Sequence, residues 1–178
     1  MPSFTKRAII ESFLRLVGKK PLEKITVRDL VDDCGINRNT FYYYFQDIYA
    51  VMEEICALAV ETLPREESLS VTLCSFFRTL GQSAVQYPKP AKGFLMSLGS
   101  EGIERYFAPS LDKAIAACLY RHCRTIEEHY CRHLTSFVRH ASFGLFIDFI
   151  KDTKSQTLEE LLADLARILD ALVSTLNS

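Results

Sequence analysis

Apolar residues recur at every third or fourth position along most of the chain, which is the spacing of one face of an α-helix. In the first third of the chain this pattern predicts helices over residues 4–17, 27–34 and 38–44, and another from 48 to just before Pro64. Further helices are predicted over about 68–87, 91–99, 103–123, 126–151 and 157–176, with Pro109 as a point where the third of these can break. The pattern therefore indicates an all-α fold.

Short polar residues and one glycine mark the ends of the helices in the N-terminal segment. The hydroxyl of Thr26 can cap a helix whose third residue, Asp29, reaches back toward it. Gly35 is suited to the left-handed conformation that ends a helix, and Asn37 and Asp47 suit the N-caps of the next two helices. Residues 26–45 are therefore predicted to form two short helices joined by a tight turn, which is the organisation of a helix-turn-helix motif.

Composition narrows the class of protein further. The 178 residues are 48% hydrophobic and include only 7 glycines and 6 prolines, which argues against disorder and against a turn-rich all-β protein. The six cysteines form no C-x-x-C pair, so neither a disulfide scaffold nor a zinc ribbon is expected, and no metal or cofactor is predicted. Because the chain shows no apolar leader and no apolar run long enough to span a bilayer, we expect a cytoplasmic protein without membrane contact.

Charge is distributed unevenly along the chain. The formal net charge of −1 excludes binding of nucleic acid through bulk positive charge. Residues 1–47, however, carry eight Lys or Arg against six Asp or Glu. This local excess of positive charge is expected of a segment that faces DNA and is attached to a neutral or acidic body.

The second short helix, residues 38–44, has the side-chain chemistry of a helix that reads DNA. If Phe41 and Phe45 pack inward at i, i+4 spacing, the other side chains share the outward and flanking faces. These are Arg38, Asn39, Thr40, Tyr42, Tyr43 and Tyr44. Arg and Asn can form paired hydrogen bonds with guanine and adenine, Thr can contact the thymine methyl group, and Tyr can donate to phosphate oxygens. The alternative is a helical hairpin with a tyrosine-rich edge and no DNA contact.

The last two predicted helices have more apolar surface than one packing partner can cover. On the final helix the apolar residues span an arc of roughly 140–160°, whereas about 100° suffices for packing on one core. On the helix before it, apolar residues between 143 and 150 surround nearly the whole circumference, and Ala141, Ser142 and Gly144 would let another helix approach closely. Burial by the chain's own core and by a second subunit explains both patterns, so a homodimer is expected.

Two stretches of the N-terminal segment resemble the DNA-binding signature of TetR/AcrR transcriptional regulators. They are Thr26-Val27-Arg28-Asp29-Leu30 and Cys34-Gly35-Ile36-Asn37-Arg38-Asn39-Thr40-Phe41-Tyr42-Tyr43-Tyr44-Phe45. Residues 37–49 also resemble the subgroup that includes the dihydroxyacetone kinase operon regulator DhaS. The resemblance implies a three-helix DNA-binding domain over residues 1–47, and a helical bundle over residues 48–178 that binds an effector and dimerises through its last two helices. It further implies a repressor that binds a double-stranded DNA operator and responds to a small molecule or a partner.

The same resemblance assigns roles to individual residues. It implies base contacts from Arg28, Arg38, Asn39, Thr40 and Tyr43, and phosphate contacts from Tyr42 and Tyr44. One position departs from the family's pattern, because Ile48 stands where many members place a lysine at the start of the fourth helix. That departure removes one phosphate contact and favours a shift of this role to Lys6, Lys24 and helix N-termini.

Two alternative functions stay open at this stage. A metal or redox sensor is suggested by His122, His129, His133 and His140, together with Cys118, Cys123 and Cys131. Against it, residues 125–128 resemble a capping box that would interrupt the histidine stripe, and no carboxylate completes a ligand set. The second alternative is a transcriptional co-regulator that uses the aromatic helix against a protein.

The remaining side chains that could carry out chemistry or line a pocket fit a structural role. No Gly-x-Ser-x-Gly, phosphate-binding loop or apolar carboxylate pair is present, so no enzyme activity is expected. The aromatic and sulfur-containing residues that an effector pocket would use are Phe76, Phe77, Phe94, Met96, Tyr106, Phe107 and Tyr120. At helical spacing such residues belong to the core by default, and the effector pocket is left unassigned.

Overall fold

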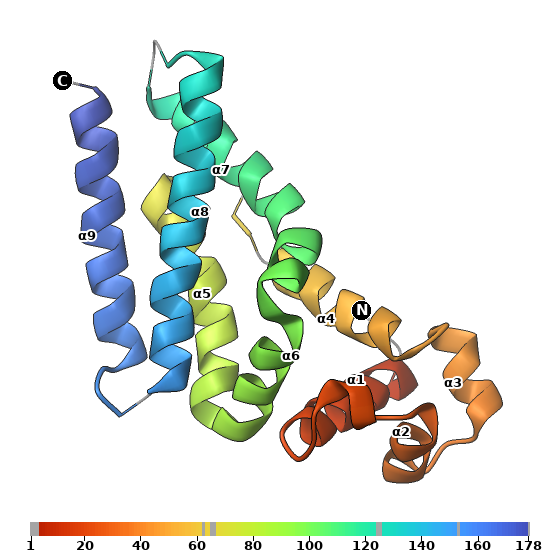
Figure 1. Ribbon diagram of the computed structural model, residues 1–178. Helices are drawn as coiled ribbons and strands as arrows, with labels where there is room; N and C mark the ends of the chain where they lie inside the picture. Colours follow the sequence, from red (N-terminus) through yellow and green to blue (C-terminus); the bar gives the residue numbers. More distant parts are fainter. Residues whose placement is uncertain (1–3, 62, 65–66, 124–125, 153, 178) are drawn as a thin grey trace.

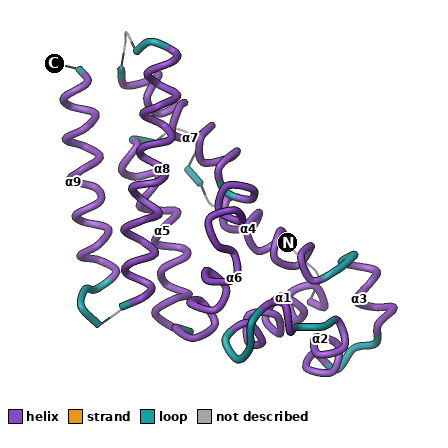
Figure 2. The backbone as a smooth tube through the Cα atoms, viewed as in Figure 1, coloured by secondary structure: helices purple, strands orange, loops and turns teal. Residues whose placement is uncertain are grey.

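The computed structural model describes residues 4–61, 63–64, 67–123, 126–152 and 154–177. Within these ranges every regular element is helical (Figures 1 and 2), which confirms the predicted all-α fold. The elements are α1 (Phe4–Val17), the short 3-10 helix η1 (Leu22–Lys24), α2 (Val27–Cys34), α3 (Arg38–Tyr44), α4 (Ile48–Glu61), α5 (Leu69–Gln86), α6 (Pro88–Tyr106), α7 (Ala108–His122), α8 (Glu128–Lys151) and α9 (Leu158–Leu176).

The first three helices form a small cluster at one end of the molecule, which we call the head (residues 4–47). Its centre consists of Ile9 and Phe13 of α1, Leu30 of α2 and Phe41 of α3, all with no exposed surface. Burial of large apolar side chains in this way contributes about 1.5–3 kcal/mol each, which holds the two short helices on α1. From the head, α4 leads into the rest of the chain (Figure 1).

The remaining helices form the body (residues 48–177), in which α5 packs along α9 and α7 packs along α8. An aromatic cluster fills its interior, and its members are Phe76 and Phe77 of α5, Phe107, and Phe143 and Phe146 of α8. Ring centroids of neighbouring members lie 5.0–6.0 Å apart, in edge-on or tilted arrangements that are favourable for aromatic pairs. The cluster joins α5 to the α6–α7 corner and to α8.

A buried arginine joins three helices of the body. Arg139 of α8 is 5% exposed and donates hydrogen bonds to Asp112 of α7 at 2.7 Å and to Glu104 of α6 at 2.6 Å. The hydrogen bond from Arg139 is the main reason that the pKa of Glu104 lies below its usual value. The two carboxylates compensate the charge that Arg139 buries, so this contact fixes the end of α6 against α7 and α8.

In the middle of the chain, the helices begin and end at other residues than predicted. The sequence predicts a helix over 103–123 with a break at Pro109, but the break falls at Phe107, and Pro109 lies in the first turn of α7, where a missing N–H costs nothing. The predicted interval between 99 and 103 is a kink within α6 at Gly99, whose φ of 59° and ψ of −173° suit glycine alone. No described helix is long and apolar enough to cross a membrane.

Candidate nucleic-acid interface

The first turn of α2 is closed by the predicted capping box. The Thr26 hydroxyl accepts a hydrogen bond from the backbone N–H of Asp29 at 3.2 Å, and the Asp29 carboxylate accepts one from the backbone N–H of Thr26 at 2.7 Å. Asp29 also forms an ion pair with Lys20 at 2.8 Å. The hydrogen bond from Lys20, followed by those from Thr26, holds the pKa of Asp29 well below its usual range. The carboxylate is therefore occupied within the head, which leaves its neighbour Arg28 to face solvent.

The turn between α2 and α3 has the geometry that its residues predict. Gly35 adopts φ 70° and ψ 29°, and its N–H donates to the carbonyl of Val31, so the left-handed residue ends α2. Two residues later, the side chain of Asn37 accepts a hydrogen bond from the backbone N–H of Thr40 at 2.8 Å and begins α3. These local interactions set the angle at which α3 leaves α2.

One aromatic pair anchors α3 to the head. Phe41 is fully buried and Phe45 is 5% exposed, with their ring centroids 6.0 Å apart. Because these residues occupy the inner side of the short helix, Tyr42 and Tyr43 point outward and are 55% and 81% exposed. The helix α3 contains no Asp or Glu. It therefore presents hydrogen-bonding side chains without the negative charge that would repel a phosphate-lined groove.

The structure divides the seven predicted DNA-contacting residues into two groups. Arg28, Arg38, Asn39, Tyr42 and Tyr43 are exposed, whereas Thr40 and Tyr44 are half-buried. The Thr40 hydroxyl already donates to Asn37 at 3.1 Å, and the ring of Tyr44 packs edge-on against Tyr43 at 4.9 Å. Arg28 makes only a long ion pair of 3.5 Å with Asp32, and both side chains are exposed. Of the five exposed residues, Tyr42 also packs edge-on against the buried ring of Phe41 at 5.5 Å, so its hydroxyl is the part that is presented to a ligand.

The start of α4 lacks a cationic side chain. Ile48 is half-buried and packs against the core, and the Asp47 side chain accepts a hydrogen bond from the backbone N–H of Ala50 at 2.8 Å. Of the two lysines expected to take over the phosphate contact, Lys6 forms an ion pair with Glu54 at 2.7 Å and lies over the Phe45 ring. Lys24 is exposed at the end of η1, so it is the better placed of the two.

The histidines of the proposed sensor cluster are dispersed. His122 ends α7, while the other three lie on α8, and His140 contacts Glu104 at 3.0 Å, far along the helix from His129. The rings of His129 and His133 are 6.5 Å apart and perpendicular. Among the described residues no three His, Cys, Asp or Glu side chains come close enough to hold a metal ion. The predicted capping box at Thr125 lies outside the described residues, and α8 begins at Glu128.

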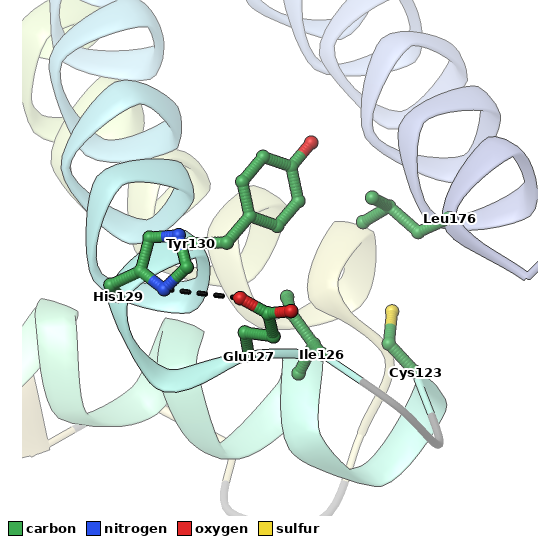
Figure 3. A pocket seen from close by; sticks show the side chains of 6 residues that line it. All are labelled: Cys123, Ile126, Glu127, His129, Tyr130 and Leu176. Carbon is green, nitrogen blue, oxygen red and sulfur yellow. Dashed lines mark ion pairs between the residues drawn. The ribbon is translucent and has the colours of Figure 1, made fainter.

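A small hollow of about 330 Å³ lies where the α7–α8 connection meets the end of α9 (Figure 3). Cys123, Ile126 and Leu176 give it an apolar side, and Tyr130 stands at its edge. The imidazole of His129 pairs with the Glu127 carboxylate at 3.3 Å. Burial raises the pKa of the Cys123 thiol, which makes it a poor thiolate and disfavours a redox or metal role for this hollow.

The aromatic residues considered for an effector pocket do not line a common hollow. Phe76, Phe77, Phe94 and Phe107 are buried in the core, and Tyr106 packs partly against it. Met96 and Tyr120 are 65% and 51% exposed on different helices. The interpretation of the buried members as core residues is therefore correct.

The chain is similar to known transcription regulators in sequence and in fold. Residues 9–55 match the family described as bacterial regulatory proteins, tetR family. No curated protein sequence gives a significant match to the chain. Three solved structures with the same fold illustrate the range of relatives.

The first of these structures is a dihydroxyacetone kinase operon activator, DhaS, with 17% identity and a TM-score of 0.72 over 99% of this chain and 100% of that one. A TetR transcriptional regulator from Streptococcus agalactiae 2603V has 20% identity and a TM-score of 0.65, covering 93% of each chain. NalD, the secondary repressor of the MexAB-OprM multidrug efflux pump in Pseudomonas aeruginosa, has 19% identity and a TM-score of 0.68 over 94% of this chain and 95% of its own.

The helix-turn-helix head on an all-helical body defines the class of the protein as a DNA-binding transcription regulator rather than an enzyme. Residues 9–55, which contain the helix-turn-helix motif, match the tetR family of bacterial regulatory proteins, and this match confirms the predicted resemblance. At 17–20% identity the three solved structures show a shared fold only. The narrower resemblance to the DhaS subgroup therefore stays a prediction.

Proposed function

We propose that this protein is a homodimeric repressor that reads an operator through α3 and is released by an effector bound to its body. The observation that carries the proposal is the anchoring of α3 by the fully buried Phe41, which leaves Arg38, Asn39 and Tyr43 exposed on a helix without acidic residues. The proposed division of the chain is a DNA-binding domain over residues 1–47 and an effector-binding and dimerisation domain over residues 48–178.

The proposed roles follow from side-chain chemistry and position. Base contacts come from Arg28, Arg38, Asn39, Thr40 and Tyr43, and phosphate contacts from Tyr42 and Tyr44. The exposed guanidinium of Arg38 suits the two acceptors of guanine, and the amide of Asn39 suits the acceptor and donor of adenine. Thr40 and Tyr44 are half-buried, so they contribute through a methyl group or a hydroxyl at the edge of the helix.

The proposed dimer uses an apolar face that the chain itself leaves uncovered. On α8, Tyr130, Phe137, Ala141, Gly144 and Leu145 are exposed at seven-, four- and three-residue spacing, which places them on one side of the helix. On the neighbouring α9, Ile168 is 56% exposed (Figure 1). Two copies of such a face would pack through a twofold axis. Ser142, expected to face the partner helix, is instead 2% exposed and points into the chain's own core.

A groove between α4 and α7 supports control by a small molecule. It has a volume of about 500 Å³ and is lined by Val60 and Glu61 of α4 and by the small side chains Ser110, Ala114 and Ala117 of α7. Since α4 starts directly after α3, a ligand that separates α4 from α7 would tilt the head. Two recognition helices about 34–36 Å apart match successive major grooves, and a tilt that changes this distance weakens binding.

Selection of DNA duplexes from a randomised library by the purified protein tests this function. We expect recovery of a near-palindromic sequence, and Arg38→Ala should lose about 1–3 kcal/mol of binding free energy and relax the preference at one position per half-site. Arg105→Ala, an exposed arginine on α6, is the matched control. No enriched sequence, together with partner-protein binding that is insensitive to salt, would favour the co-regulator function instead.

A further inference from the structure

The end of α1 and the start of α6 meet backbone to backbone. A Cβ atom at Gly93 would stand 1.9 Å from the carbonyl oxygen of Val17, and one at Gly18 would stand 2.7 Å from the backbone nitrogen of Pro90. Only glycine at both positions permits this approach, because real Cβ contacts are not that short. The first turns of α6 are therefore held against the head, although they follow it in the sequence by more than one helix (Figure 1).

This joint brings lysines from two distant segments onto one surface. On α6, Lys89 and Lys92 are exposed, and neither forms an ion pair with any described residue. Across a hollow of about 380 Å³, lined by Gly93 and Met96 on the α6 side, lie Lys19 and Lys20 of the segment after α1. We call Lys19, Lys20, Lys24, Lys89 and Lys92 the lysine strip.

The strip is continuous with the proposed DNA-reading surface. Lys20 pairs with Asp29 at 2.8 Å, which places this part of the strip against the first turn of α2, directly beside Arg28. Among the described residues, Glu23 is the one carboxylate that lines the hollow. The carboxylate of Asp29 is already occupied by Lys20 and the α2 cap, so the strip as a whole is positively charged.

We propose that the lysine strip, and Lys89 and Lys92 of α6 in particular, forms a second contact surface for the phosphate backbone of DNA. Lys89 and Lys92, which no described carboxylate neutralises, would complement the phosphates of a duplex bound at the head and release their counterions. The contact lies on α6 of the body, outside the segment assigned to DNA binding, and it turns with the head because of the glycine joint. The strip adds positive charge to a protein in which Ile48 stands at the start of α4 in place of a lysine. This inference rests on the proposed DNA-binding function.

The salt dependence of DNA binding tests the proposal. The probe is a labelled duplex selected by the wild-type protein, compared with a scrambled duplex, and affinities are measured between about 50 and 200 mM salt. For Lys89→Gln with Lys92→Gln, the plot of log affinity against log salt should become shallower by about 0.9 for each phosphate that the variant no longer neutralises. The ratio of affinities for the selected and scrambled duplexes should stay within about twofold of wild type, because phosphate contacts carry no base information.

The matched control is Lys113→Gln with Arg132→Gln, which removes two exposed charges from α7 and α8. We expect this control to keep the wild-type slope. If the α6 double variant keeps the wild-type slope as well, or if the control lowers it equally, the proposed contact surface is wrong. If the wild-type protein selects no duplex at all, the proposed function itself fails, and this outcome is distinct from an unchanged slope.

Discussion

The buried hydroxyl of Ser12 on α1 donates a hydrogen bond of 2.7 Å to the carboxylate of Asp33 near the end of α2. Arg15, one turn further along α1, forms an ion pair with the same carboxylate at 2.6 Å. The hydrogen bond from Ser12, followed by that from Arg15, lowers the pKa of Asp33 below its usual value of 3.8. This contact ties the first helix of the motif to α1 and so helps to set the position of the recognition helix.

Stability should depend on pH through Asp33. The pKa of Asp33 is lower in the folded state than in the unfolded state. The ionised carboxylate therefore stabilises the fold fully at pH values above its unfolded-state pKa, and this stabilisation is lost as the pH falls through its folded-state pKa. Asp33→Asn should cost about 1.5–3 kcal/mol at neutral pH, the usual range for a hydrogen bond to a charged group. In urea titrations, the difference in free energy of unfolding between wild type and Asp33→Asn should become smaller at acid pH. A difference that stays constant down to the acid unfolding transition would contradict this role. Ser12→Ala should weaken the same dependence of stability on pH.

The joint between α1 and α6 should be intolerant of any side chain at Gly93. Gly93→Ala places a methyl group against the Val17 carbonyl, and relief requires the two helices to separate. We expect a loss of about 1–3 kcal/mol in the free energy of unfolding, the typical cost of overpacking. Denaturant titration measures the loss, and Lys92→Ala, one residue earlier and exposed, should change stability by no more than about 0.5 kcal/mol. Equal stability of the two variants would show that the helices separate freely.

Assembly should fail when a charge is placed on the uncovered face of α9. Ile168→Glu would bury a carboxylate in the proposed dimer interface at a cost of several kcal/mol. Sedimentation velocity should show a dimer for wild type and a monomer for this variant at the same concentration. Val85→Glu, an equally exposed valine on α5, is the control and should leave the mass of the assembly unchanged. A dimeric Ile168→Glu protein would place the interface elsewhere.

Cysteine reactivity separates a structural role from a sensor role. Burial, with a smaller effect from Glu53, raises the pKa of Cys56 to about 12, so almost none of this thiol is ionised at neutral pH. Treatment of the native protein with iodoacetamide should leave Cys56 unmodified, whereas the urea-unfolded chain should be alkylated there, as peptide mass mapping can show. Rapid labelling of Cys56 in the native state would argue for a reactive thiol and would revive the redox alternative.

Local signals predicted the motif well because its geometry is set by neighbours in sequence. The Thr26–Asp29 box, the left-handed Gly35 and the Asn37 cap each involve residues within three or four positions of one another. The positions of α6 and α7 were less predictable. The interval predicted after residue 99 is a kink at Gly99 inside α6, and the break expected at Pro109 falls at Phe107, between α6 and α7. At the second break, Phe107 packs against Phe76 and Phe143 in the aromatic cluster of the body, a long-range contact that the local pattern does not encode.

The amino-acid sequence alone determined the all-helical class, the ends of the first helices and the chemistry of residues 38–44, because hydrophobic spacing and capping act over one or two turns. The tertiary structure decided which of the predicted contact residues face outward. It exposes Tyr43, half-buries Tyr44 and buries Ser142 in the core. It also decided that Lys92 lies beside the head, since the contact of Gly93 with Val17 joins segments about 75 residues apart. Such a contact depends on how whole helices pack, and no local pattern encodes it.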